Sequence, residues 1–118
     1  IITIGSDDPR PRTRRISLPA APERLHRNAD EAIAVLKAMA SHNRLLLLCE
    51  LVSGERSVGE LAQSLDLAQS TVSQHLSLLR RDGVVSGRRE AQSIHYRICD
   101  PRVQALMATL FEQFCTHD

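Results

Sequence analysis

The segment SVGELAQSLDLAQSTVSQHLSLLRRDG restricts the fold of this chain more than any other stretch. It begins at Ser57 and has Glu60 three residues later, which is the spacing of a capping box that starts a helix. Apolar residues at helical spacing then predict a short helix over 58–65 and a second helix over about 69–82. The few residues between these helices allow only a tight turn, so the segment predicts a helix-turn-helix.

The apolar spacing changes after Gly83, the glycine expected to end the second helix. Residues 93–98 alternate apolar and polar side chains, a pattern that predicts a half-buried strand. Residues 84–86 can pair with this strand antiparallel, which places the hairpin tip at 89–92. A helix-turn-helix followed by a basic hairpin is a winged helix-turn-helix.

Apolar stripes outside this motif predict three more helices. The first covers about 23–39. Ser41 or Asn43 caps the second, which continues to about Val52 and is apolar nearly all round, so it is expected at the centre of the domain. Pro101 suits the first turn of a last helix. That helix has a broader apolar stripe than a small core needs, formed by Val103, Leu106, Met107, Leu110, Phe111 and Phe114. The expected fold class is mainly α with a small β-hairpin, in the order ααααββα.

Residues that could read DNA are expected on the second helix of the motif and on the hairpin. Small hydroxyl side chains let a helix approach phosphates, and an amide can make paired hydrogen bonds to a base edge. Residues 68–97 hold five arginines against two acidic residues, a local net charge of +3 that suits a face meeting phosphates. A generic polar helix and a solvated hairpin are the alternative. The candidate DNA-binding residues are Gln69, Ser70, Thr71, Ser73, Gln74, His75, Arg88 and Arg89.

The chain of 118 residues is long enough for one domain with its own core. Residues 1–22 hold four of the five prolines and four arginines without any period, so we expect a basic tail before a domain over 23–118. The tail could contact the DNA backbone or act as a spacer. No apolar run approaches the roughly 20 residues of a membrane span, and no secretion signal is evident. A cytoplasmic protein with reduced thiols and no membrane partner is therefore expected.

The runs SHNRL, VGELA, STVSQHLSLLRRDGVV and IHYRI, in this order, resemble the ArsR/SmtB family of bacterial winged-helix repressors. The resemblance covers about residues 25–117. It implies a homodimer joined by the first and last helices, which accounts for the wide apolar stripe. It also implies that two recognition helices enter successive major grooves of an inverted repeat in double-stranded DNA. Ala68 departs from the family pattern, where serine commonly caps the recognition helix. A lost cap costs on the order of 1 kcal/mol.

Metal-binding members of the family carry ligands that this chain lacks. Arsenic and cadmium sensors have cysteines before and at the start of the third helix, where this chain has ERSVGE. Zinc and nickel sensors have an acid-x-histidine pair and a later histidine pair on the last helix. Here that region offers only His117 beyond its acidic residues and Cys115. We therefore expect no metal and no cofactor.

The three cysteines are an odd number, which argues against a disulfide framework. Cys49 lies late in the second helix and Cys115 near the end of the last, two helices that the family packs together. This pair resembles the persulfide- and redox-sensing branch of the family. In that branch, reactive sulfur species or oxidants link the two thiols by a disulfide or a longer sulfur chain, and DNA affinity falls. Cys115 should be the more accessible thiol and Cys49 the less acidic one, and Cys99 is expected to be structural. Two buried cysteines that never react are the alternative.

Three functions remain open from the sequence. The first is a DNA-binding repressor switched by thiol chemistry at Cys49 and Cys115. The second is a repressor that responds to a metal or haem held by Cys49, Cys115 or His117. The third is a dimeric interaction module without regulated DNA binding. An enzyme is not expected, because the sequence shows no Ser/His/acid order, Gly-rich phosphate loop or HExxH motif.

Overall fold

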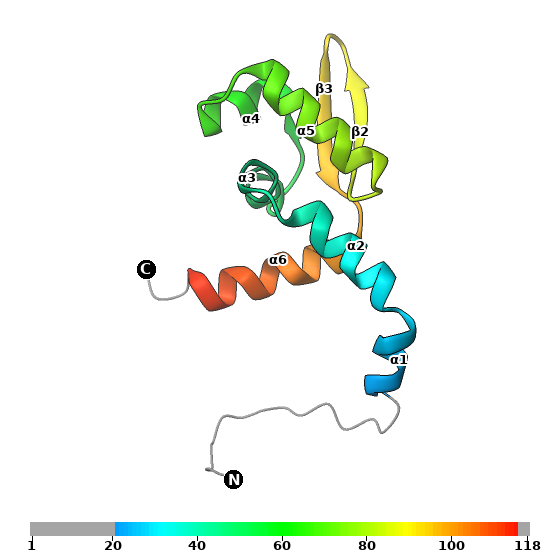
Figure 1. The fold of residues 1–118 in the computed structure, drawn as a ribbon. Helices are drawn as coiled ribbons and strands as arrows, with labels where there is room; N and C mark the ends of the chain where they lie inside the picture. The colour runs from blue at the N-terminus through cyan, green and yellow to red at the C-terminus, as the bar shows by residue number, and fades with distance from the viewer. Residues whose placement is uncertain (1–20, 116–118) are drawn as a thin grey trace. The chain divides into compact units, whose positions relative to one another are not determined.

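The computed structural model describes residues 21–115. Its contacts divide the chain into a unit that ends at Ala32 and a unit that begins at Ile33, and every site considered below lies in the second unit. The expected tail over 1–22 lies outside the described residues except for its last two residues, which begin the first helix. The elements are α1 (Ala21–Arg27), α2 (Ala29–Met39), α3 (His42–Leu51), β1 (Arg56–Ser57), α4 (Val58–Leu65), α5 (Gln69–Arg81), β2 (Val85–Glu90), β3 (Ser93–Ile98) and α6 (Pro101–Phe114) (Figure 1).

The prediction of one helix over 23–39 is wrong in one respect, because Asn28 separates α1 from α2. The Asn28 N–H donates to the carbonyls of Arg24 and Leu25, both at 3.1 Å, so the chain forms a turn there rather than ending its hydrogen bonding. Asparagine side chains compete with the helix for backbone hydrogen bonds, which lowers the free-energy cost of such a break.

Of the two predicted caps, Ser41 and Asn43, it is Ser41 that caps α3: its Oγ accepts a hydrogen bond from the Arg44 N–H at 3.4 Å. The Arg44 Nε donates to the Ala38 carbonyl at 2.8 Å, which holds α3 against the end of α2. The two helices meet at 90°. No single helix among the described residues is long and apolar enough to cross a membrane, and this bent pair passes that test by length and composition only.

The helix-turn-helix consists of α4 and α5, close to the predicted bounds. Both halves of the capping box are present: the Glu60 N–H donates to Ser57 Oγ at 3.1 Å, and the Ser57 N–H donates to Glu60 Oε1 at 2.8 Å. The turn after α4 uses Asp66 in the left-handed conformation, with φ 55°, which polar Asp tolerates better than most residues. Ala68 gives α5 no side-chain cap, as expected from the sequence.

The sheet has three strands in the order β1-β3-β2, so the predicted hairpin gains one strand that the sequence analysis missed. β2 is longer than predicted. Arg89 lies in the ladder opposite Ile94, and the tip is the pair Ala91-Gln92 rather than 89–92. The extension follows because every residue from 85 to 90 finds a partner on β3.

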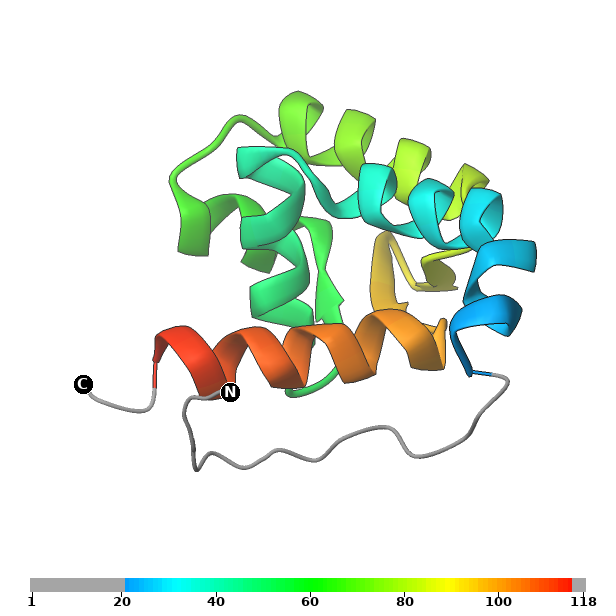
Figure 2. The same cartoon turned by 60° about the horizontal axis from the view of Figure 1, so that its bottom comes forward.

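α6 closes the core of the second unit. The Asp100 side chain caps it by accepting from the Arg102 N–H at 2.9 Å, and Pro101 occupies the first turn. Both views show α3 directed across α6 rather than along it (Figures 1 and 2). The core consists of Ala38, Met39, Leu47, Leu48, Leu51, Leu61, Ala62, Val72, Leu76, Leu79, Val84, Val85, Tyr96, Val103 and Met107. Val103 and Met107, two members of the apolar stripe on α6, are thus buried within one subunit.

Candidate functional site

One face of α5 presents a continuous polar row to solvent. Gln69 and Gln74 are exposed, and small hydroxyl side chains lie between and beside them. Residues three and four apart share a helix face, so the row continues toward the C-terminal end of α5. Its exposed members are Ser70, Ser73, Gln74, Ser77 and Arg80. The side chains at the start of this face are small, and the one at its end is basic. Such a face allows the helix to come close to an anionic groove.

Two of the predicted DNA-reading residues are less available. Thr71 and His75 are half-buried, and the Nδ1 atom of His75 is buried without a hydrogen-bond partner. A buried ring nitrogen without a partner is rare in proteins. Because the Nδ1 edge of the His75 ring is covered by protein and Gln74 is exposed, Gln74 is the better placed of the two for a base contact.

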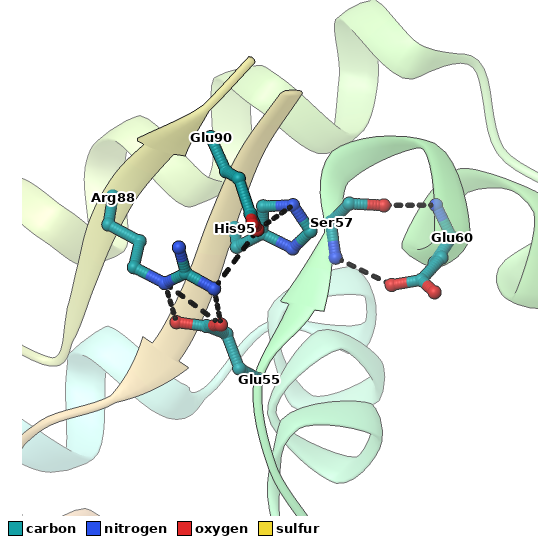
Figure 3. A network of polar contacts seen from close by, with 6 residues as sticks. All are labelled: Glu55, Ser57, Glu60, Arg88, Glu90 and His95. Carbon is teal, nitrogen blue, oxygen red and sulfur yellow. Dashed lines mark hydrogen bonds and ion pairs between the residues drawn. The ribbon is translucent and has the colours of Figure 1, made fainter. Parts of the chain in front are cut away.

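Arg88, one of the predicted DNA contacts, makes a bidentate ion pair within the protein (Figure 3). Its Nε lies 2.9 Å from Oε2 of Glu55, and its Nη2 lies 2.7 Å from Oε1 of the same carboxylate. Nη2 is also 3.2 Å from Oε1 of Glu90. His95 Nε2 is 3.7 Å from that same Glu90 oxygen. The Arg88 hydrogen bonds hold the pKa of Glu55 below its ordinary value of 4.5.

Arg89 lies on the opposite face of β2, because side chains alternate along a strand. It pairs with Ile94, on the same face as Val85 and Gly87, whereas Arg88 pairs with His95. A cleft of about 410 Å³ lies on this side, between the end of α5 and the hairpin. It is lined by Arg80, Val85, Ser86, Gly87, Arg88, Arg89 and Ile94.

The two cysteines predicted as a pair line one cavity. Cys49 on α3 is half-buried, and Cys115, which follows α6, is exposed. The cavity has a volume of about 360 Å³, and its other walls are apolar: Leu45, Met107, Leu110, Phe111 and Phe114. Two thiols that are 66 residues apart in the chain therefore line the same cavity, whose other lining residues are all apolar.

Burial raises the pKa of the Cys49 thiol above its ordinary value of 9.0, and Cys115 and Glu50 raise it further. A raised pKa leaves less of the reactive thiolate near neutral pH. Cys115 is thus the more exposed of the two thiols, and burial makes Cys49 less acidic than an ordinary cysteine.

The third thiol, Cys99, lies outside this cavity. It is exposed, and its Sγ lies 3.5 Å from the Gly83 carbonyl, just after β3. The Cys99 N–H also donates to the Val84 carbonyl at 2.9 Å, so the residue joins the end of the sheet to the end of α5. Within residues 21–115, no group of three or more His, Cys, Asp and Glu side chains is placed to hold a metal ion. His117, a ligand in one alternative, lies outside the described residues.

Comparison with known proteins decides the family. Residues 41–86 match the model of the family described as bacterial regulatory protein, arsR family. The transcriptional activator HlyU of Vibrio cholerae is 44% identical over 93 residues, which cover 79% of this chain and 86% of that protein. The chain belongs to the ArsR family. The biofilm growth-associated repressor of Agrobacterium fabrum is likewise 44% identical, over 100 residues that cover 85% of this chain and 82% of that protein.

Solved ArsR-family structures share the fold. The transcriptional repressor BigR from Xylella fastidiosa has a TM-score of 0.77 at 38% identity and covers 81% of this chain and 98% of its own. Reduced HlyU from Vibrio cholerae has a TM-score of 0.75 at 44% identity and covers 80% of this chain and 99% of its own. This ArsR-family chain is therefore a DNA-binding transcription regulator with a winged helix-turn-helix.

Two residues beside the predicted DNA-binding residues of this ArsR-family chain, Glu55 and Arg80, were not among the candidates. Glu55 precedes β1 and meets Arg88 across 33 positions, a separation at which the sequence gives no signal. Arg80 could have been found, because it follows Ser73 and Ser77 at helical spacing on the exposed face of α5.

Proposed function

We propose that this protein is a homodimeric repressor that binds an inverted repeat in double-stranded DNA and releases it when Cys49 and Cys115 become linked. The link is a disulfide or a longer sulfur chain, formed by reactive sulfur species or by oxidants. The observation that carries the proposal is the shared apolar cavity of about 360 Å³ that both thiols line. Because both thiols line this cavity, a sulfur bridge across it would connect α3 to the residue that follows α6.

The first step occurs at the exposed thiol. The Cys115 thiolate attacks the outer sulfur of a persulfide RSSH, which forms Cys115–S–SH and releases RS⁻ as the leaving thiolate. The Cys49 thiolate then attacks Sγ of Cys115, and HS⁻ leaves as the disulfide closes. If Cys115 carries two added sulfurs, attack on the first of them closes a trisulfide and again expels HS⁻. Apolar walls suit this chemistry, because uncharged sulfur chains lose little hydration on entering them.

Glu50 offers a route from the thiol cavity to the DNA-binding helices. It follows Cys49 on α3, and its Oε1 accepts from the Ser64 hydroxyl of α4 at 3.0 Å. The same oxygen lies 3.4 Å from Nη2 of Arg56 in β1. A bridge that shifts α3 therefore pulls on α4 and on the sheet. To weaken DNA binding 100-fold, the bridge must favour the non-binding arrangement by about 2.7 kcal/mol.

Exposed apolar side chains support the homodimer. Ile33 and Leu36 of α2 are 48% and 52% exposed, and Phe114 of α6 is 76% exposed. Apolar groups of this size on two helices are a liability in a monomer and suit a subunit interface. Val103 and Met107, by contrast, are buried in the core of the subunit itself and are not available to a partner.

Two named relatives are consistent with the proposal. The Agrobacterium fabrum relative is called a repressor, and one solved neighbour is described as reduced HlyU. A homodimeric winged helix-turn-helix domain from Mycobacterium bovis also shares the fold, with a TM-score of 0.67 at 31% identity.

The test compares DNA release by single-cysteine variants. The reduced protein should bind an operator selected from a random DNA pool and release it after treatment with a sulfane-sulfur donor. Cys49→Ser and Cys115→Ser should bind the same operator and fail to release it. Mass spectrometry of the treated protein should show a link between the two cysteine-containing peptides.

Cys99→Ser is the matched control, because this thiol lies outside the cavity and should not affect release. Normal persulfide-driven release by Cys49→Ser would refute the switch. Release that follows metal addition to the reduced protein, with no change of thiol mass, would favour a metal-responsive repressor. Absence of any DNA binding by the reduced protein would favour an interaction module.

A further inference from the structure

Adjacent arginines on the wing face opposite ways and meet different surroundings. Arg88 shares its face of the sheet with His95 and Glu90, and Figure 3 shows its guanidinium turned onto Glu55. Arg89 shares the other face with Gly87 and Ile94, where α5 packs against β2. One residue of separation therefore gives the two cations different neighbours.

The charge of Arg88 is already matched within the protein. Two parallel N–H···O bonds to Glu55, at 2.9 and 2.7 Å, form the fork geometry that binds arginine most strongly to a carboxylate. Glu90 adds a second carboxylate at 3.2 Å. The three side chains together carry a net charge of −1, and the exposed Arg97 on the same face brings the sum to zero. The charge of Arg88 itself is therefore not available to a phosphate.

This ion pair also joins two separate parts of the fold. Glu55 lies in the segment that leads from α3 into β1, and Arg88 lies in β2, at the far edge of the three-stranded sheet from β1. The pair thus spans β3 and links both edges of the sheet. It fixes the distance between the wing and the start of α4, where Ser57 and Glu60 form the capping box (Figure 3).

The other face keeps its cations unmatched. Among the described residues, neither Arg89 nor Arg80 makes an ion pair or a side-chain hydrogen bond. Both line the cleft of about 410 Å³ between α5 and the wing. Arg88 also lines this cleft, but its guanidinium is paired with Glu55. Arg80 also ends the exposed polar row of α5, so the cleft continues the face proposed to meet DNA.

We infer that the wing separates two tasks: Glu55 and Arg88 are positioning residues that brace the wing, whereas Arg89 and Arg80 hold a DNA phosphate in the cleft. The inference rests on the DNA-binding part of the proposed function and is independent of the thiol switch. It reassigns Arg88, which the sequence suggested as a DNA contact, and it adds Arg80 to the DNA-binding residues.

The experiment measures how the affinity for DNA depends on salt. The probe is a random-sequence duplex of about 30 base pairs, close to three helical turns. Each phosphate contact contributes about 0.9 to the slope of log affinity against log salt. Arg89→Ala and Arg80→Ala should each lower that slope by about 0.9 per subunit. Arg88→Ala should leave the slope unchanged, because its charge is already matched by Glu55.

Exchanging the charges of Glu55 and Arg88 distinguishes a residue that positions the wing from one that contacts DNA. Glu55→Arg or Arg88→Glu alone should lower the thermal midpoint and weaken binding, whereas the two changes together should re-form the ion pair and restore both. If Arg88 contacts phosphate, the doubly changed protein still carries Glu at that position and binding stays weak. DNA binding by Glu55→Gln is a second test. Tighter binding with a steeper salt slope would mean that Glu55 competes with a DNA phosphate for Arg88, and would overturn the inference.

Failure of this inference can be told from failure of the proposed function. If the unchanged protein binds the duplex with a normal salt slope but Arg89→Ala and Arg80→Ala share that slope, the assignment of the cleft is wrong and DNA binding stands. If the unchanged protein fails to bind at low salt, both are wrong. Circular dichroism of each variant confirms that the comparison is between folded proteins.

Discussion

Gly87 lies directly opposite Tyr96 in the hairpin, and the ring of Tyr96 lies against it. A Cβ atom at position 87 would lie 2.9 Å from Cε1 of that ring, closer than packed carbon atoms approach. Tyr96 is 5% exposed and belongs to the core, so it cannot easily move away. Glycine here makes room for an aromatic residue on the neighbouring strand, a known use of glycine within sheets.

We therefore expect Gly87→Ala to destabilise the fold by about 1–3 kcal/mol, the usual cost of overpacking. Chemical denaturation followed by circular dichroism measures the change. Gly59→Ala is the matched control: a Cβ there meets its nearest neighbour, Gln69 Nε2, at 3.9 Å, and alanine favours the helix. A Gly87→Ala protein as stable as the unchanged one would mean that the Tyr96 ring is free to shift.

Gln74→Ala should weaken binding to a selected operator by roughly 1–3 kcal/mol, the usual value of a good base contact. Gln74 is exposed in the middle of the polar row, and its amide can make paired hydrogen bonds to a base edge. Gln63→Ala, the same change on the exposed face of α4, is the control and should have a smaller effect. Equal losses on operator and random DNA for Gln74→Ala would show that this side chain does not read bases.

Alkylation should distinguish the two thiols of the cavity. Because burial raises the pKa of Cys49 above 9.0, its thiolate is scarce near neutral pH, and its rate of reaction with iodoacetamide should keep rising with pH beyond 9.0. Cys115 is exposed and should react first. Peptide mass spectrometry over a pH series gives both rates. Faster alkylation of Cys49 than of Cys115 at neutral pH would reverse the proposed order of attack.

Stability should fall in acid. Hydrogen bonds hold the pKa values of Glu55 and Glu60 below their ordinary 4.5 in the folded protein. A lowered folded pKa stabilises the fold at pH values above 4.5, and this contribution is lost as pH falls through the folded values. The urea midpoint of Glu55→Gln should therefore vary less with pH in this range than that of the unchanged protein. Identical pH profiles would show that the Glu55 ion pair contributes nothing to stability.

The dimer should depend on the exposed apolar side chains. Leu36→Glu places a charge in the proposed interface and should give a monomer in sedimentation experiments at micromolar concentration, where the unchanged protein stays dimeric. Burying several such side chains at about 25 cal/mol per Å² accounts for many kcal/mol before the entropy of association is subtracted. A dimer that survives Leu36→Glu would place the interface elsewhere.

Local signals in the sequence predicted the elements that local interactions specify. The capping box at Ser57 and Glu60, the end of α5 before Gly83 and the cap-free start at Ala68 all depend on residues within a few positions of each other. β1 escaped prediction because two residues carry no alternation, and this strand exists only where β3 offers it a partner. The Glu55 ion pair escaped for the same reason, since its partner is distant in the chain.

For the candidate thiols too, position along the chain depends on local signals, whereas chemistry depends on contacts between distant residues. That Cys49 lies on α3 could be predicted, because helical periodicity is a local property. Cys115 was expected near the end of the last helix and follows that helix directly, as its C-cap. The cavity between them depends on how Leu45, Met107 and Phe111 pack, which no single segment determines. The raised pKa of Cys49 comes chiefly from that packing, through burial.

Ser57 ends β1 and also caps α4, so one residue serves the sheet and the helix at once. Its backbone pairs with β3 opposite His95, while its hydroxyl accepts the Glu60 N–H. Because the ladder and the cap meet in this one residue, no linker separates the sheet from the start of α4. The first helix of the motif is therefore joined directly to β3, and a rotation of α4 is passed to the wing at Ser57.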